Sequence, residues 1–128
     1  MPTRHRIGGR QFGLPSDQRR ALLKGLVRAL IINKQIETTE ARAKDLSGII
    51  EKLVTKAKDD SVHSRRVART YLGGHSGGAW GDETVIRELF TVIAPTFANR
   101  NGGYTRMAKL GIRRGDGAPI VVLQFVND

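Results

Sequence analysis

Two apolar stripes with the spacing of an α-helix occupy the first half of the chain, and they constrain its fold more than any other feature. The first predicts a helix of about 17 residues after a capping Ser16, with apolar positions at Leu22, Leu23, Leu26, Val27, Leu30 and Ile31. Thr39 caps a second predicted helix, with a supporting Glu40–Lys44 pair and buried positions at Ala43, Leu46, Ile50, Leu53 and Ala57. A helix with one apolar face must cover another layer, so we expect a two-layer domain.

The remaining segments predict that second layer and two more helices. Residues 35–38 predict a short strand, and a third helix begins at Asp60 or Ser61 and runs to about Leu72. Asp82 caps a fourth helix that stops near Pro95, with inward positions at Val85, Ile86, Leu89, Phe90 and Ile93. Residues 104–112 and 120–126 predict two strands joined by a hairpin loop, and the second is so apolar that we expect cover on both faces. The order α-β-α-α-α-β-β predicts an α+β fold, with helices packed on a small three-stranded mixed sheet.

The charge of the chain limits its partners. Its 128 residues include 22 Lys and Arg against 12 Asp and Glu, a formal net charge of +10. Such an excess repels itself on a compact body unless a polyanion is the usual neighbour, which leaves nucleic acid or an anionic membrane surface. No apolar run is long enough to span a membrane, and no cysteine is present for a disulfide or a thiolate metal site. We therefore expect a soluble protein of the cytoplasm.

The first cluster of bases lies in residues 1–34, which contain a single acid, Asp17. Residues 1–15 show no periodicity, so we expect an extended arm ahead of one globular domain at 16–128. The arm is either a frayed, solvated tail or a segment that folds on RNA. Its cations are arginines without lysine, and guanidinium groups suit bidentate phosphate contacts, which favours RNA. The candidate RNA-binding residues here are Arg4, His5, Arg6 and Arg10 in the arm and Arg19, Arg20 and Lys24 on the first helix.

The second cluster of bases lies in residues 100–117, which also contain a single acid, Asp116. A solvated hairpin is the alternative interpretation. Tyr104 beside Arg106 would place a stacking ring next to a phosphate donor, a combination suited to unpaired RNA bases. Asp116 between glycines is a turn former rather than a catalytic carboxylate. The candidate RNA-binding residues here are Arg100, Tyr104, Arg106, Lys109, Arg113 and Arg114.

Residues for catalysis, metals or cofactors show no pattern. His5, His63 and His75 lie far apart without cysteine, so we expect no metal site. The glycine clusters at 73–78 and 111–117 lack the Lys-Ser or Lys-Thr of a phosphate loop, and no nucleophile signature is present. The basic first helix has too few apolar neighbours to favour a membrane surface. The sequence predicts no enzyme, no cofactor and no small-molecule substrate.

Several motifs together resemble one known family. Residues 101–107 (NGGYTRM) and 113–119 (RRGDGAP) resemble the C-terminal signature of the bacterial large-subunit ribosomal protein L17 family. Arg4-His5-Arg6 with Gly9-Arg10 resembles its N-terminal arm, and Glu37-Thr38-Thr39 with Ala43-Lys44 its strand-to-helix junction. The chain departs from the family in its longer start, in Asp17-Gln18-Arg19 where Ser-His-Arg is usual, and in an insertion at Gly73–Gly81. In that insertion, Trp80 either contacts a neighbour or pins the loop to the core.

The resemblance implies a structural role in the ribosome. The family binds large-subunit rRNA near the outer end of the nascent-chain tunnel, beside other ribosomal proteins, and helps the rRNA to reach and hold its fold. Two other classes remain open. A DNA-binding nucleoid protein would share the charge and the helices, and a small ribonuclease would need an acid–base pair, for which His5 and Asp116 are the nominees.

Overall fold

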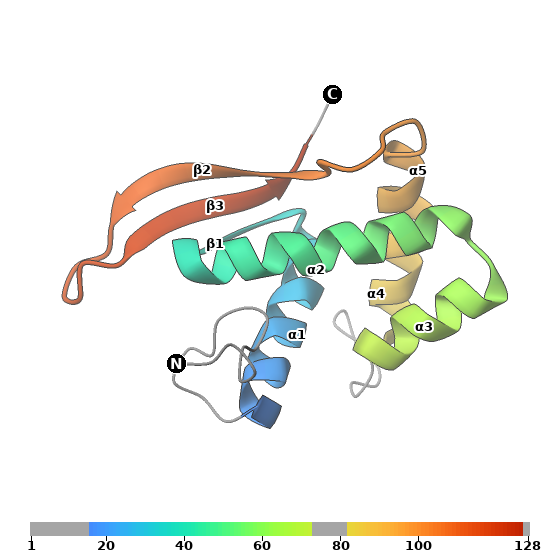
Figure 1. Cartoon of the computed structure of the whole chain (residues 1–128), viewed down its shortest axis with the longest axis horizontal. Helices are drawn as coiled ribbons and strands as arrows, with labels where there is room; N and C mark the ends of the chain where they lie inside the picture. The colour runs from blue at the N-terminus through green and yellow to red at the C-terminus, as the bar shows by residue number, and fades with distance from the viewer. Residues whose placement is uncertain (1–15, 73–81, 127–128) are drawn as a thin grey trace, which may run out of the picture.

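Helices cover one face of a three-stranded sheet, whose hairpin extends beyond them (Figure 1). The structure is a computed structural model that describes residues 16–72 and 82–126, and the side chains of residues 17–72 and 84–126. The elements follow the predicted order: α1 (Ser16–Asn33), β1 (Gln35–Thr39), α2 (Glu40–Asp59), α3 (Val62–Leu72), α4 (Asp82–Glu88), the π-turn η2 (Leu89–Ile93), α5 (Ala94–Thr96), β2 (Thr105–Ile112) and β3 (Pro119–Phe125). The predicted arm, the Ser16 and Asp82 capping side chains and the 73–81 insertion with Trp80 lie outside the described residues.

The first helix turns directly into the first strand. Lys34 adopts a left-handed backbone with φ +69°, and its N–H donates to the carbonyl of Leu30 at 2.8 Å. This closing bond satisfies a carbonyl that the end of the helix would otherwise leave open. The Lys34 ammonium donates to the carbonyl of Ile31 and to Glu88, each at 2.9 Å. Lys34 therefore ends α1, directly precedes β1 and connects this junction to α4.

The second helix is confirmed in detail. Thr39 Oγ1 accepts the N–H of Arg42 at 3.5 Å, and the Glu40–Lys44 ion pair spans 3.3 Å. All five predicted stripe residues are buried, and Val54 joins them. The helix ends at Asp60, whose φ is +44°.

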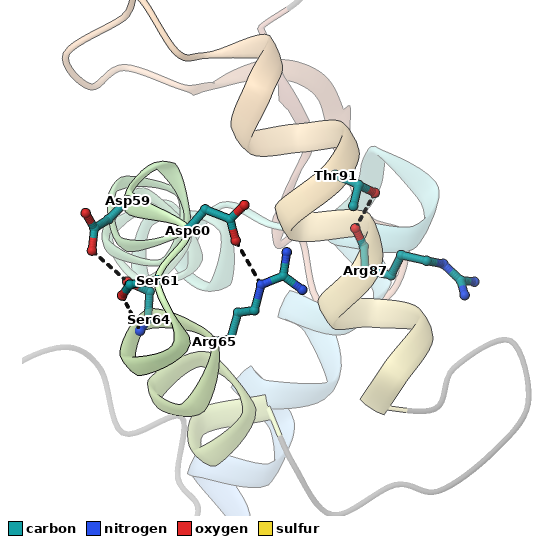
Figure 2. A network of polar contacts seen from close by, with 7 residues as sticks. All are labelled: Asp59, Asp60, Ser61, Ser64, Arg65, Arg87 and Thr91. Atoms are coloured by element: carbon teal, nitrogen blue, oxygen red, sulfur yellow. Dashed lines mark hydrogen bonds and ion pairs between the residues drawn. The ribbon is translucent and has the colours of Figure 1, made fainter.

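The α2–α3 junction is held by short-range polar contacts (Figure 2). Ser61 Oγ accepts the N–H of Ser64 at 3.0 Å, which confirms the predicted start of the third helix. Ser64 Oγ donates to Asp59 at 3.2 Å, and Arg65 Nε donates to Asp60 at 2.8 Å. The Arg65 guanidinium also lies 4.9 Å from the centre of the Phe90 ring. Arg65 thus joins α3 to the α2 terminus and to η2.

The fourth helix contains a π-turn that the sequence pattern did not predict. The predicted inward residues of this helix are buried, and the helix ends at Thr96, close to the predicted stop. Before Pro95, however, the chain widens into η2, and the N–H of Ala94 donates to the carbonyl of Leu89, five residues back. Proline has no N–H, and its ring clashes with the carbonyl four residues earlier. We attribute the wider turn to Pro95, which it admits without a break in the helix.

The sheet has the order β1-β3-β2, and both pairings are antiparallel. The prediction of a mixed sheet was therefore wrong: β1 and β2 both run opposite to the central strand. The prediction that the last strand is covered on both faces was also wrong. Val121 and Leu123 are buried beneath the helices, whereas Ile120, Val122 and Gln124 on the opposite face are only half-buried. β3 is apolar along most of its length because it is the central strand of the sheet and because one of its faces is buried.

The β2–β3 hairpin extends past the start of α2, with its loop at the far tip (Figure 1). Every residue of β2 after Thr105 is exposed. Met107, Leu110 and Ile112 are the large apolar side chains among them. A register shift between Lys109 and Gly111 interrupts the β2–β3 ladder. Basic and apolar side chains thus share a strand that stands away from the core.

One basic side chain of α1 is part of the core. Arg28 on α1 is only 2% exposed, and its guanidinium donates to the carbonyl of Leu72 at the end of α3. A cation at a helix C-terminus complements the helix dipole and satisfies an open carbonyl. Arg28 therefore ties α1 to α3.

We expect Arg28→Leu to lower the free energy of unfolding by about 2–3 kcal/mol, because it leaves a buried carbonyl without its charged donor. Urea denaturation followed by circular dichroism measures this loss. Arg87→Leu is the matched control: Arg87 is exposed on α4, and its loss should change stability by less than about 0.5 kcal/mol. Equal effects of the two substitutions would contradict the structural role of Arg28.

Candidate nucleic-acid interface

The predicted cations that the structure describes occupy two surfaces. The helix surface comprises Arg19, Arg20 and Lys24, on the first turns of α1. The hairpin surface comprises Arg106 and Lys109 on β2 and Arg113 and Arg114 in the loop that follows. Arg100 precedes β2 and is half-buried. Arg4, His5, Arg6 and Arg10 lie outside the described residues.

Arg106 lies on the face of the sheet opposite the buried Val121 and Leu123. It pairs with Gln124 on β3, which pairs in turn with Gln35 on β1, so the three side chains share one face. With the Gln124 amide oxygen turned toward Arg106, the guanidinium donates to it at 2.7 and 3.0 Å, and the amide nitrogen donates to Gln35 at 3.2 Å. This row orders an exposed cation before any partner arrives, and ordering in advance reduces the entropy lost on binding.

Asp116 organises the loop at the tip of the hairpin. Its carboxylate accepts from Arg113 Nε at 3.1 Å, from Arg113 Nη2, and from the N–H of Ala118 at 3.2 Å. The hydrogen bonds from Arg113 and then from Ala118 lower the pKa of Asp116 from 3.8 to about 2. Asp116 is thus the turn former that the sequence predicts. Its charge offsets that of Arg113, so Arg114 is the loop cation without a salt bridge in the described structure.

Tyr104 does not offer the stacking ring that the sequence predicted. It is 1% exposed, and its ring packs against Phe97 with centroids 5.2 Å apart. Its hydroxyl lies 3.2 Å from both Thr55 Oγ1 and Lys58 Nζ, and these contacts, that of Thr55 first, lower the pKa of the phenol. A ring with both faces covered cannot stack on a base. We therefore leave Tyr104 out of the RNA-binding set.

Tyr104 instead anchors the base of the hairpin to α2. Glu51 on α2 accepts the N–H of Gly103 at 2.9 Å and that of Tyr104 at 2.8 Å. Lys58, two turns further along α2, donates to the carbonyl of Arg100. Gly102 and Gly103 have φ of +111° and +63°, a backbone that glycine adopts without strain. The glycine–tyrosine motif therefore positions the hairpin and its cations.

The sequence interpretation missed the exposed face of α3 that carries Arg66. His63 and Arg66 are exposed, and they share a face with Val67 and Thr70 that lies opposite the buried Ser64, Ala68 and Leu72. That helical spacing was the available signal, because it assigns Arg66 to the outer face of a helix whose inner face is buried. This face adjoins Arg20 and Lys24 across a groove between α1 and α3.

The described residues give little support to catalysis or metal binding. Among residues 16–72 and 82–126, no three His, Cys, Asp or Glu side chains gather where they could hold a metal ion. No helix in the same ranges is long and apolar enough to cross a membrane. Asp116 is paired with Arg113 and has a pKa of about 2, so it is a poor general acid or base near neutral pH. Its nominated partner His5 lies outside the described residues.

Comparison with known proteins gives the family. The family model described as ribosomal protein L17 matches residues 22–126. The large ribosomal subunit protein bL17 of Shouchella clausii is 48% identical over 116 residues, which cover 91% of this chain and 97% of that protein. The bL17 protein of Thermodesulfovibrio yellowstonii is 45% identical over 124 residues, which cover 97% and 87%. The chain belongs to the ribosomal protein L17 family. Members of the L17 family are structural ribosomal proteins and not enzymes, so the ribonuclease and nucleoid alternatives are set aside.

The pKa of Asp116 predicts how the hairpin loop of this L17 protein responds to acid. Because the folded pKa lies below the ordinary value, the Asp116–Arg113 contact is complete above pH 3.8 and is lost as the pH falls through about 2. We expect an NMR titration of the Asp116 carboxyl carbon, with the Ala118 amide as a second probe, to show this midpoint. Arg113→Ala should move the midpoint toward 3.8, and Lys109→Ala, the control, should not. A midpoint near 3.8 in the unaltered protein would contradict the pairing.

Proposed function

We propose that this protein binds and stabilises large-subunit rRNA near the outer end of the nascent-chain tunnel, beside neighbouring ribosomal proteins. Membership of the L17 family makes it a structural constituent of the large ribosomal subunit in the cytoplasm. The resemblance of its terminal motifs to that family supports the position at the tunnel exit. The observation that carries the proposal is a group of exposed cations on a hairpin that extends beyond the helices, with one of them, Arg106, ordered by Gln124.

The proposed mechanism is electrostatic. The hairpin surface and the helix surface each place guanidinium groups where phosphates can approach, and each contact releases counterions from the RNA. Affinity should therefore fall with salt, with a log–log slope of roughly 0.7–0.9 for each contact. Specificity would come mainly from RNA shape, 2′-hydroxyls and exposed loops. The arm at residues 1–15, with three arginines and no acid, would add contacts of the same kind.

Sedimentation through a sucrose gradient tests the proposal and the role of the arm. We expect the full chain to co-sediment with large subunits in gentle, magnesium-rich lysates. Deletion of residues 1–15 should leave the fold intact and move most of the protein to the top of the gradient, because we expect the arm to contribute its contacts to RNA. Full-length protein found wholly free of ribosomal particles would overturn the proposed function. Unchanged co-sedimentation of the deletion variant would overturn the role of the arm alone.

The hairpin surface is tested at Arg106 and Arg114, its two arginines that form no salt bridge in the described structure. We expect Arg106→Ala with Arg114→Ala to weaken binding to an rRNA fragment at least tenfold in a filter-binding titration, and to lower the salt slope by about 1.4–1.8. Thermal stability should change little, since both side chains are exposed.

The matched control is Lys52→Ala with Lys56→Ala, which removes the same charge from exposed positions on α2. Equal weakening by the two pairs would show that net charge, and not the hairpin, determines affinity. A large loss of stability in the arginine pair would assign those residues to the fold.

A further inference from the structure

An open groove of about 810 Å³ runs between α1 and α3, away from the hairpin surface. Each helix lines it with residues at i, i+3, i+4 and i+7: positions 17, 20, 21 and 24 on α1, and positions 63, 66, 67 and 70 on α3. This spacing makes one continuous face on each helix. The groove is therefore built from two matching faces, and Tyr71 also lines it.

Cations dominate the rim of this groove. Arg20 and Arg66 both occupy the i+3 position and are exposed, and neither forms a salt bridge in the described part of the chain. Lys24 and His63 lie on the same rim, and Asp17 is the acid among its lining residues. The rim thus carries a net positive charge.

Nearby arginines have structural partners, which sets Arg20 and Arg66 apart. Arg65, one residue before Arg66, donates to Asp60 (Figure 2) and also lies over the Phe90 ring. Arg28, two turns after Arg20 on α1, donates to the carbonyl of Leu72 in the core. Neither groove arginine makes a comparable contact in the described chain, so both are available to a ligand.

The walls of the groove are more apolar than a site that binds only phosphates requires. They are formed by Ala21, Val67 and Tyr71, and Tyr71 is half-buried. Apolar walls with cations at the rim suit a ligand that is itself flat and apolar in one part and anionic in another. A nucleotide has both parts, because its base is a stacking surface and its phosphate is an anion.

Charge disfavours two other occupants of the groove. Residues 1–15 of the chain carry Arg4, Arg6 and Arg10 and no acid, so a basic rim repels them. A second copy of the chain carries a net charge of +10 and is repelled in the same way.

We propose that the α1–α3 groove holds an unpaired segment of rRNA, with phosphates on Arg20 and Arg66 and a base against Val67 and Tyr71. This site rests on the proposed function and extends the helix surface, of which Arg20 is part, across the groove to α3. An unpaired segment is required, because a duplex keeps its bases stacked inside and presents only its backbone and groove edges to such a surface.

Two substitutions of equal charge test the site. We expect Arg20→Ala with Arg66→Ala to weaken binding of a short unstructured oligoribonucleotide at least tenfold, and to lower its salt slope by about 1.4, the value for two single-strand contacts. Lys52→Ala with Lys56→Ala removes the same net charge outside the groove and should have a much smaller effect. Circular dichroism checks that both variants are folded.

Tyr71→Leu tests the base contact separately, because it keeps an apolar side chain and removes the aromatic face. We expect it to weaken binding of the oligoribonucleotide by about fivefold or more and to leave binding of a duplex RNA of the same length unchanged. Equal losses in the groove and control pairs, or an equal loss on duplex RNA, would overturn the groove site while leaving the proposed function in place. A wild-type protein that binds no rRNA fragment would overturn both.

Discussion

Burial of the apolar stripe of α2 is the interaction on which the rest of the structure depends. The helix packs against α1, α3, α5, η2 and all three strands, so most of the core forms on its surface. Leu46, Ile50 and Val54 are fully buried, and each such side chain contributes about 1.5–3 kcal/mol relative to exposure. Because these residues recur on one face, the helix can cover the sheet and still leave its other face to solvent.

The polar side of α2 then determines where the functional surface lies. Just before β2, Glu51 accepts the N–H of Tyr104, and Lys58 donates to the carbonyl of Arg100. Thr55 lies between them on α2 and contacts the Tyr104 hydroxyl. A carboxylate that accepts two backbone N–H groups is a strong local tie, because hydrogen bonds to charged groups are stronger than neutral ones. The hairpin cations extend from this tie without contributing to the core. Stability and the proposed RNA contact therefore fall to different residues of the same segment.

Sequence reasoning succeeded where one local force decides the outcome. The Thr39 cap, the α2 stripe, the start of α3 at Ser61 and the Asp116 turn each follow from the chemistry of a few neighbouring residues. It failed where partners distant in the chain decide. Strand direction depends on how β1 meets β3, some 85 positions later, and nothing in Gln35–Thr39 encodes that meeting.

The failures at the candidate site have the same origin. Tyr104 beside Arg106 has the composition of a stacking site, but Glu51, Thr55 and Lys58 on α2 draw the ring into the core. Arg28 and Arg65 are likewise drawn into structural contacts by Leu72, Asp60 and Phe90. The number of basic residues in the sequence therefore overestimates the number that are available to bind RNA. The helical spacing of α3, read against its buried face, was the one unused signal, and it leads to Arg66.

The exposed edge strand β2 affects how the protein behaves before it is assembled into the ribosome. β2 is an outer strand with unpaired backbone groups, and Met107, Leu110 and Ile112 accompany them at the surface. Such an edge invites another strand, although Lys109 and the register shift beside it oppose that pairing. Newly synthesised copies are thus most prone to aggregate in the interval before they join the ribosomal subunit. Synthesis of the protein in step with the supply of rRNA shortens that interval.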